Sequence, residues 1–143
     1  MSSSSNPRLP LNIVAIFSIV GCVIGIFYGL CLNYIQALSH AEVEQIVAAQ
    51  GLAQGEEVVG SIFELSRIGN FYALFNVLEI VALVIILFGK RVGFHVYAAA
   101  QLGFVGLMVM IFGVVGSVTY ILWCILWCYI YWVLIQNANR KEA

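Results

Sequence analysis

The sequence has little charge and no aspartate. Charged residues make up 9% of the 143 residues, and the net charge is −1, whereas soluble domains carry about 25% charged residues. A surface that faces water requires charge, so this deficit excludes an ordinary soluble domain. The chain also lacks any run of basic residues, so we expect no nucleic-acid partner.

Cysteine and histidine are few and are not spaced as metal ligands or disulfides. No Cys-x-x-Cys motif and no paired histidines occur, so the spacing matches no zinc site. The stretch 35–70 contains no cysteine, which argues against an external domain held by disulfides. Our favoured interpretation therefore includes no metal ion and no cofactor.

Long hydrophobic runs fill most of the chain. A helix needs about 20 apolar residues to cross a hydrocarbon core about 30 Å thick, and four stretches meet this requirement. The sequence therefore predicts an all-α polytopic membrane protein, a single domain over residues 1–143, in which four transmembrane helices form a bundle in contact with the lipid bilayer. The predicted spans are Leu11–Tyr34, Phe71–Gly89, Phe94–Phe112 and Val118–Ile135.

The basic residues are distributed unevenly between the two sides of the predicted bundle. With an even number of spans, five of them fall on the side of both termini and one on the other side. Basic residues favour the cytoplasmic side, so we expect both termini in the cytoplasm and residues 35–70 outside. This bias, with a first span that has no acid, excludes the small multidrug exporters that insert in both orientations. The five residues are Arg8, Lys90, Arg91, Arg140 and Lys141, and the sixth is Arg67.

The outward connection, residues 35–70, is long and acidic. It holds five of the seven acids, and its 41–50 part has good helix formers with Val43, Ile46 and Val47 on one face. Two glycines interrupt this pattern before a helical pattern resumes over 56–68. We interpret the connection as two amphipathic helices. They either dock a partner or cap a cavity, or they form a solvated hairpin on the lipid headgroups.

Small residues recur in the first span. Gly21, Gly25 and Gly29 are four residues apart, and Ser18 precedes them by nearly one turn. This spacing places them on one helix face, where a neighbouring helix can approach closely. The sequence predicts a helix-packing face there, whose partner is either another span of this chain or another subunit.

The fourth span contains the tetrapeptide Ile-Leu-Trp-Cys twice, over residues 121–128. The repeat places Trp123 and Trp127 on one stripe, and Cys124 and Cys128 on the next. Such an aromatic wall would suit a quinone or a lipid, and a thiol pair would suit a soft metal such as copper(I). The alternative is packing alone, with rings against lipid or a neighbour and small cysteines at a helix contact.

Glu79 is the only acid within a predicted span. A charged carboxylate near the bilayer centre costs about 2.5–3.5 kcal/mol on insertion scales, so we expect it to be protonated, hydrogen-bonded or in contact with water. Asn76 lies one turn earlier on the same face, and Gln101 and Tyr129 lie at similar depth in the next two spans. The sequence predicts a polar cluster of these four side chains, which serves as interhelical hydrogen bonding, partner contact, or proton or cation transport.

A basic turn, Lys90-Arg91, is followed by Gly-Phe-x-x-Tyr-x-x-x-Gln over 93–101. This stretch resembles a segment of small four-helix bacterial inner-membrane proteins. The first span with its glycines, the long outward loop and the short turn between the third and fourth spans are similar as well. The resemblance implies a location in the bacterial inner membrane. It implies no established activity, so no catalytic residues are carried over.

For function, the sequence favours a non-catalytic protein that acts by association, because no catalytic constellation is evident. It would be an accessory or structural subunit of a membrane complex, or it would associate with itself. The alternative is a small proton- or cation-coupled transporter or channel that uses Glu79. A weaker alternative is a membrane enzyme, or a quinone- or lipid-binding protein, that uses the aromatic and cysteine face of the fourth span.

Overall fold

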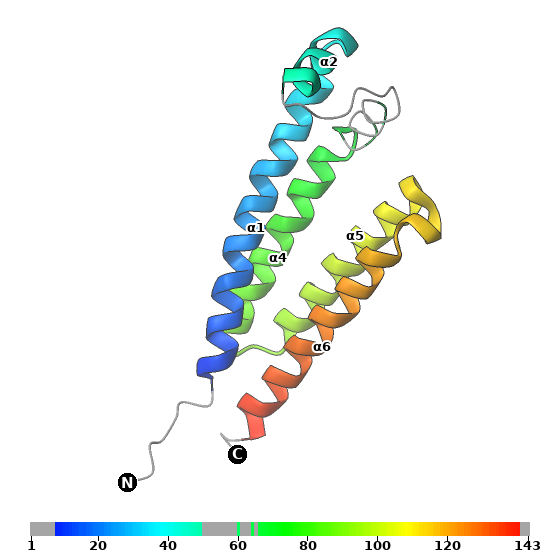
Figure 1. Cartoon of the computed structure of the whole chain (residues 1–143). Helices are drawn as coiled ribbons and strands as arrows, with labels where there is room; N and C mark the ends of the chain where they lie inside the picture. The colour runs from blue at the N-terminus through cyan, green and yellow to red at the C-terminus, as the bar shows by residue number, and fades with distance from the viewer. Residues whose placement is uncertain (1–7, 50–59, 61–63, 65, 141–143) are drawn as a thin grey trace. The chain divides into compact units, whose positions relative to one another are not determined.

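The structure is a computed structural model that describes residues 8–49, 60, 64 and 66–140. Within these residues it contains helices and no strand, which confirms the all-α prediction. Figure 1 shows the helices in chain order. Their bounds are α1 Leu9–Gln36, α2 His40–Ala49, α4 Gly69–Leu87, α5 Val92–Gly116 and α6 Val118–Arg140.

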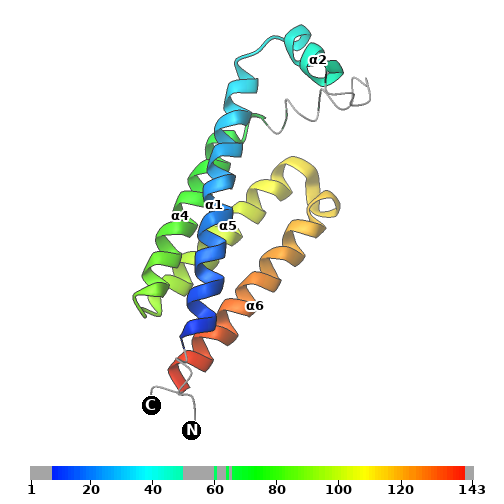
Figure 2. The same ribbon diagram turned by 60° about the vertical axis from the view of Figure 1, so that its left-hand side comes forward.

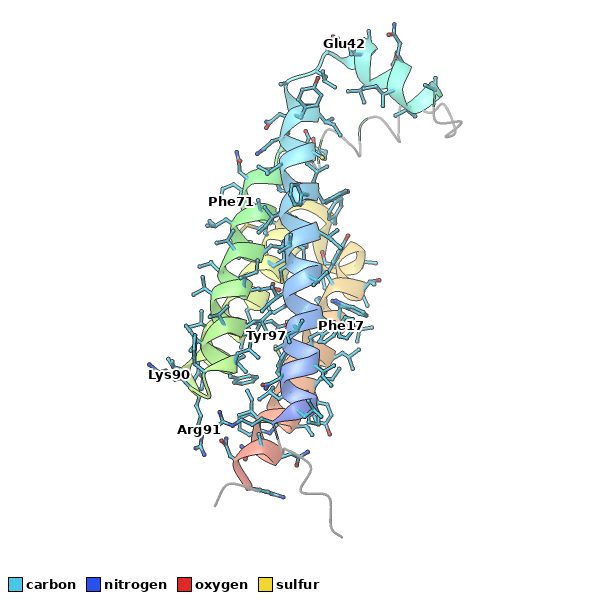
Figure 3. All side chains as sticks on the ribbon, turned by 90° about the vertical axis from the view of Figure 1, so that its left-hand side faces the viewer. Phe17, Glu42, Phe71, Lys90, Arg91 and Tyr97 are labelled. Carbon is cyan, nitrogen blue, oxygen red and sulfur yellow. The ribbon has the colours of Figure 1, made fainter. Side chains whose placement is uncertain are left out.

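Four of these helices are long and apolar enough to cross a membrane, as the hydropathy of the sequence predicts. They are α1, α4, α5 and α6, with 28, 19, 25 and 23 residues. Apolar side chains cover the outside of these helices, because lipid rather than water is their solvent. Phe17 of α1, for example, is 74% exposed and projects from the helix in Figure 3.

Glycines mark the breaks in the helical backbone. Gly89 follows α4 with a φ of 78°, and Gly113 interrupts α5 with a φ of 68° and a ψ of 175°. A positive φ is readily adopted by glycine alone, so these two residues set where the regular helices end. The regular part of α5 therefore stops at Phe112, where the predicted third span also ends. The helical pattern predicted for 56–68 falls largely outside the described residues.

The chain divides into two compact units. The first unit comprises the residues up to Val23 together with those from Phe75 onward, and the second comprises Ile24–Leu74. Helices α1 and α4 each contribute to both units.

In the first unit, α1, α4, α5 and α6 pack around a shared core. The buried residues of α6 are seven positions apart, Cys124, Tyr131 and Ala138, which is the spacing of a left-handed helix seam. In both ribbon views, α5 and α6 run side by side as an antiparallel pair (Figures 1 and 2). The core consists of Leu11, Ala15, Cys22, Ala82, Leu83, Ile86, Tyr97, Tyr131 and Ala138.

Helices α4 and α5 meet through Gly93. A Cβ atom built at Gly93 would lie 2.7 Å from the carbonyl oxygen of Ala82 and 2.8 Å from the backbone nitrogen of Ile86. The two backbones can approach this closely only because Gly93 has no side chain. The short connection from Gly89 to Arg91 thus leads directly into a tight helix pair.

In the second unit, the C-terminal part of α1 packs on the N-terminal part of α4 through a pair of glycines. A Cβ atom at Gly29 would lie 2.7 Å from the Gly69 carbonyl oxygen, and one at Gly69 would lie 2.6 Å from the Gly29 carbonyl oxygen. Next to this contact, the side-chain amide of Asn33 donates a hydrogen bond to Asn70. Close backbone contact and an interhelical hydrogen bond are the two usual ways to join helices in lipid.

The short helix α2 packs on the end of α1 in the same unit. Val43 and Val47 are buried against Ile35 and Leu38, as the predicted apolar face requires. Ile46, which the same pattern placed on that face, is 46% exposed instead. A contact patch of two residues is narrow, and Ile46 lies about 100° around the helix from Val47, so it points away from α1.

A hydrogen-bonded box at Ser39 fixes the start of α2. The backbone N–H and the hydroxyl of Ser39 donate to Oε2 of Glu42 at 2.8 and 2.7 Å, and the Glu42 N–H donates to Ser39 Oγ at 3.4 Å. These bonds lower the pKa of the Glu42 carboxyl group from its ordinary value of 4.5. The pattern Ser-x-x-Glu is a capping box that is recognisable in the sequence, and our sequence interpretation missed it.

Candidate intramembrane polar site

Glu79 lies near the middle of α4, ten residues after Gly69 and eight before Leu87. The helix rises about 1.5 Å per residue, so the carboxyl group is far from both ends of the span. Its side chain is half-buried and points into the first unit. The structure therefore places an ionisable group in the middle of α4, among apolar helices.

The carboxyl group of Glu79 has partners on two other helices. The Cys22 thiol of α1 donates to Glu79 Oε2, with 3.5 Å between sulfur and oxygen. The side chain of Gln101, on α5, also interacts with the Glu79 carboxyl group. Cys22 is thirteen residues after Leu9 and fourteen before Gln36, so the contact joins the midpoints of α1 and α4.

Gln101 continues the polar contacts along α5. Its amide nitrogen donates to the Tyr97 hydroxyl oxygen at 3.2 Å, and both side chains are buried. Three of the four defined positions of the Gly-Phe-x-x-Tyr-x-x-x-Gln stretch therefore line the inner face of α5, namely Gly93, Tyr97 and Gln101. Tyr97 is labelled in Figure 3, where it lies in the interior between the helices.

Tyr131 links α6 to α1. Its hydroxyl donates to Ser18 Oγ at 2.7 Å and lies 3.4 Å from the Val14 carbonyl oxygen. Its ring centroid is 4.8 Å from that of Tyr97, and its side chain is fully buried. The two tyrosines thus place the Ser18 contact beside the Glu79 contact. These contacts form one polar layer that crosses all four helices of the first unit. The polar layer consists of Ser18, Cys22, Glu79, Tyr97, Gln101 and Tyr131.

The side chains in this layer are not the same four that the sequence predicted as a cluster. Glu79 and Gln101 do meet, and Asn76 is half-buried one turn away on α4. Tyr129 does not belong to the layer, because its side chain is 65% exposed. Residues two apart on a helix point in directions about 200° apart, and it is Tyr131 that faces inward. The sequence interpretation also missed Cys22 and Tyr97, which lie at the same depth.

The predicted glycine face of α1 does not pack as one surface. Gly25 and Gly29 are buried, and Ser18 receives the Tyr131 hydrogen bond. A Cβ atom at Gly21, in contrast, would meet nothing within 4 Å. The buried line on α1 is Leu11, Ala15, Cys22, Gly25, Gly29 and Leu32. It follows steps of three and four residues rather than steps of four alone, so Gly21 falls outside it.

The aromatic stripe and the cysteine stripe of α6 differ in burial. Trp123 is 58% exposed, whereas Cys124 is buried. The ring centroids of Trp123 and Trp127 are 5.8 Å apart, and Trp127 continues to Tyr131 at 6.1 Å. Cys124 and Cys128 lie one turn apart on α6, and both are free thiols. Among the described residues, no group of three or more histidine, cysteine or acidic side chains is placed to hold a metal ion.

The polar groups of this layer are paired with one another inside the bundle. The carboxyl group accepts a hydrogen bond from the Cys22 thiol, and the hydroxyl groups of Tyr97 and Tyr131 each have a partner on another residue. In lipid, such bonds between helices replace the water that polar groups would otherwise require. Comparison of the chain with protein-family models, with curated proteins and with solved structures finds no match.

Proposed function

We propose that this chain is a non-catalytic integral membrane protein that acts by association, either as an accessory or structural subunit of a membrane complex or as a homo-oligomer. The observation that carries the proposal is the open notch at Gly21 in the middle of α1. At Gly29, two turns later on the same helix, the backbone of Gly69 occupies the space that a side chain would take. At Gly21, nothing lies within 4 Å of a Cβ atom.

The surroundings of Gly21 support contact with another helix. Phe17 and Ile24, one turn before and one turn after, are 74% and 64% exposed. Large side chains beside a glycine give a helix surface with ridges and a gap, which a second helix can enter closely. Lipid chains explain the exposed apolar residues, but they do not require a glycine at this position.

Extraction at native expression level followed by native mass spectrometry tests the association. We expect the wild-type protein to carry a stoichiometric partner subunit or a second copy of itself. Gly21→Leu should release that partner, because the new side chain fills the gap and its Cβ atom would meet nothing within 4 Å among the described residues. Val20→Leu is the matched control, since Val20 is already 54% exposed and its replacement leaves the notch open. A wild-type monomer, or a Gly21→Leu protein that keeps its partner, contradicts the proposal.

A second candidate function is a proton- or cation-coupled transporter or channel. The observation that favours it is the polar layer, which contains the Glu79 carboxyl group and in which the rings of Tyr97 and Tyr131 join two sets of hydrogen bonds. Glu79→Gln keeps the size and hydrogen-bonding capacity of the side chain but cannot exchange a proton. Loss of ion flux in proteoliposomes with an unchanged native mass would support transport, and unchanged flux would exclude proton carriage by Glu79.

We propose the bacterial inner membrane as the location, with both termini in the cytoplasm and residues 35–70 outside. The resemblance over 90–101 supports the membrane type. The basic residues support the orientation, because five of the six lie on the side of the termini.

A further inference from the structure

In the first unit, the contact between α1 and α4 joins one ionisable group from each helix. The Cys22 thiol donates to Glu79 Oε2, with 3.5 Å between sulfur and oxygen. Cys22 is 6% exposed, and Glu79 is half-buried. The packing of α1 on α4 at this depth therefore places a thiol over a carboxyl group.

The hydrogen-bond donors at this contact suit a neutral carboxyl group better than a carboxylate. An ionised carboxylate has about four acceptor positions, whereas a thiol is a weak donor. The Gln101 side chain interacts with Glu79, but its amide nitrogen already donates to the Tyr97 hydroxyl. The backbone N–H groups of a helix interior are occupied within the helix. In the protonated form, one carboxyl oxygen still accepts from the thiol, and fewer acceptor positions remain to be satisfied.

The titratable side chains that face Glu79 cannot offset a negative charge. One lies on α1, one on α5 and three on α6, and each of them is neutral or becomes negative when it loses a proton. A carboxylate among them would gain no opposite charge. These side chains are Cys22, Tyr97, Cys124, Cys128 and Tyr131.

The cations that the structure describes in this unit lie at the ends of helices. His95 is exposed, and it lies two residues from Tyr97, so it points to the opposite side of α5. The others precede α1, join α4 to α5, or end α6, whereas Glu79 is eight residues from the end of α4. They are Arg8, Lys90, Arg91 and Arg140.

We propose that Glu79 acts as a proton-operated latch between α1 and α4. With the carboxyl group protonated, the pair is neutral, and α1 packs on α4 through Cys22. Loss of the proton leaves a charge that requires water, and water can surround it where α1 moves away from α4. The latch requires neither a partner subunit nor ion flux.

The sign of the latch follows from the form that each state favours. The closed contact favours the protonated carboxyl group, so it is stable at low pH and is lost as the pH rises. The capping box at Ser39 has the opposite sign, because its hydrogen bonds favour the ionised form of Glu42.

Amide exchange of the full chain in a neutral detergent tests the latch between about pH 5 and pH 9, the range in which buried carboxyl groups titrate. Glu79→Gln keeps a neutral side chain of similar size at every pH. At about pH 5, we expect equal exchange of the α1 amides around Cys22 in both proteins. At about pH 9, exchange should be at least about tenfold faster in the wild type, because each pH unit above the titration point favours the open form about tenfold.

Glu44→Gln is the matched control, since it removes an exposed carboxyl group on α2 and should keep the wild-type pH dependence. Equal exchange in the wild type and Glu79→Gln at every pH overturns the proposal. So does loss of the pH dependence in both variants.

The infrared band of a protonated carboxyl group decides the proposal on the wild type alone, even if Glu79→Gln fails to fold. At about pH 6, a carboxyl group in water is ionised, because its pKa is about 4.3, and every other glutamate lies outside the four spans. We expect a band at this pH that disappears over the same pH range in which the α1 amides begin to exchange faster than their intrinsic rates predict. Absence of the band, or its loss without faster exchange in α1, overturns the latch.

Discussion

At the scale of single residues, two tyrosines on α6 have opposite environments. The Tyr131 side chain is fully buried with its hydroxyl bonded to Ser18, whereas Tyr129 is 65% exposed. The same functional group therefore contributes to helix packing at one position and faces lipid at the other. This pair allows a contact in the polar layer to be measured with a control on the same helix.

Tyr131→Phe should destabilise the protein by about 0.6–2 kcal/mol, the usual range for a hydrogen bond between membrane helices. The change removes the hydroxyl that bonds to Ser18 Oγ and keeps the ring that contacts Tyr97. Reversible unfolding in mixed micelles measures the difference. Tyr129→Phe should change the free energy of unfolding by less than about 0.5 kcal/mol, and an equal loss in both variants would contradict the assignment.

Residue identities explain why the site was only partly predictable. Glu79 stands out because an acid in an apolar span is costly, and Gln101 stands out because it too is a polar side chain in an apolar span. The choice between Tyr129 and Tyr131 depends on the rotation of α6, and a helix that is apolar all round gives no periodicity from which to read that rotation. Cys22 was missed because a buried cysteine is normally a small apolar residue.

At the scale of elements, helix contacts depend on particular glycines. Gly93 of α5 lies against the backbone of α4, whereas a Cβ atom at Gly106 of the same helix would meet nothing within 4 Å. Both are helical glycines, so the intrinsic preference of the helix for alanine acts equally on each. The difference between them isolates the effect of close packing.

Gly93→Ala should cost about 1–3 kcal/mol, the range for overpacking a tight contact. The added methyl group would press on the Ala82 carbonyl and force α4 and α5 apart. Gly106→Ala should cause no loss and can gain up to about 1 kcal/mol, because alanine favours the helix. Thermal unfolding of both variants in the same detergent tests this order, which equal stabilities would contradict.

The capping box makes the start of α2 sensitive to acid. Because hydrogen bonds from Ser39 lower the pKa of Glu42 in the folded helix, its contribution is fully present above the ordinary value of 4.5. It is lost as the pH falls through the lowered pKa. Amide exchange over residues 43–47 should therefore accelerate as the pH falls below about 4.5, after correction for intrinsic exchange.

Glu42→Gln should abolish this acid-dependent change, since a glutamine side chain does not titrate. Glu44→Gln, on the same helix but outside the box, should retain it. If the Glu44 variant loses the dependence and the Glu42 variant keeps it, the capping assignment is wrong.

At the scale of the whole molecule, the four apolar spans were predictable because membrane insertion depends on summed hydropathy over about 20 residues. Such a sum tolerates errors at single positions, which is why the helix count agrees with the sequence interpretation. Contacts depend instead on how each helix is rotated about its axis. Gly21 and Gly29 were therefore predicted to lie on one packing face, although only Gly29 contacts another helix. The fold class was thus more predictable than the packing.

The distribution of basic residues predicts how the molecule is inserted. An alkaline phosphatase fused after Ala49 should be active, because that position is expected outside the cytoplasm. The same enzyme fused after Arg140 should be inactive, while a fluorescent protein at that position should fold and fluoresce. The reverse pattern would show that both termini lie outside.

The four free cysteines have graded exposure: Cys31 is exposed, Cys128 is intermediate, and Cys22 and Cys124 are buried. Because a thiol must be accessible to react, the unmodified chain carries its own set of chemical probes. Alkylation of Cys31 would report on the outer surface of α1, whereas alkylation of Cys22 requires the helices around Glu79 to separate. Opening of the bundle can therefore be followed by mass in native membranes, without any introduced label site.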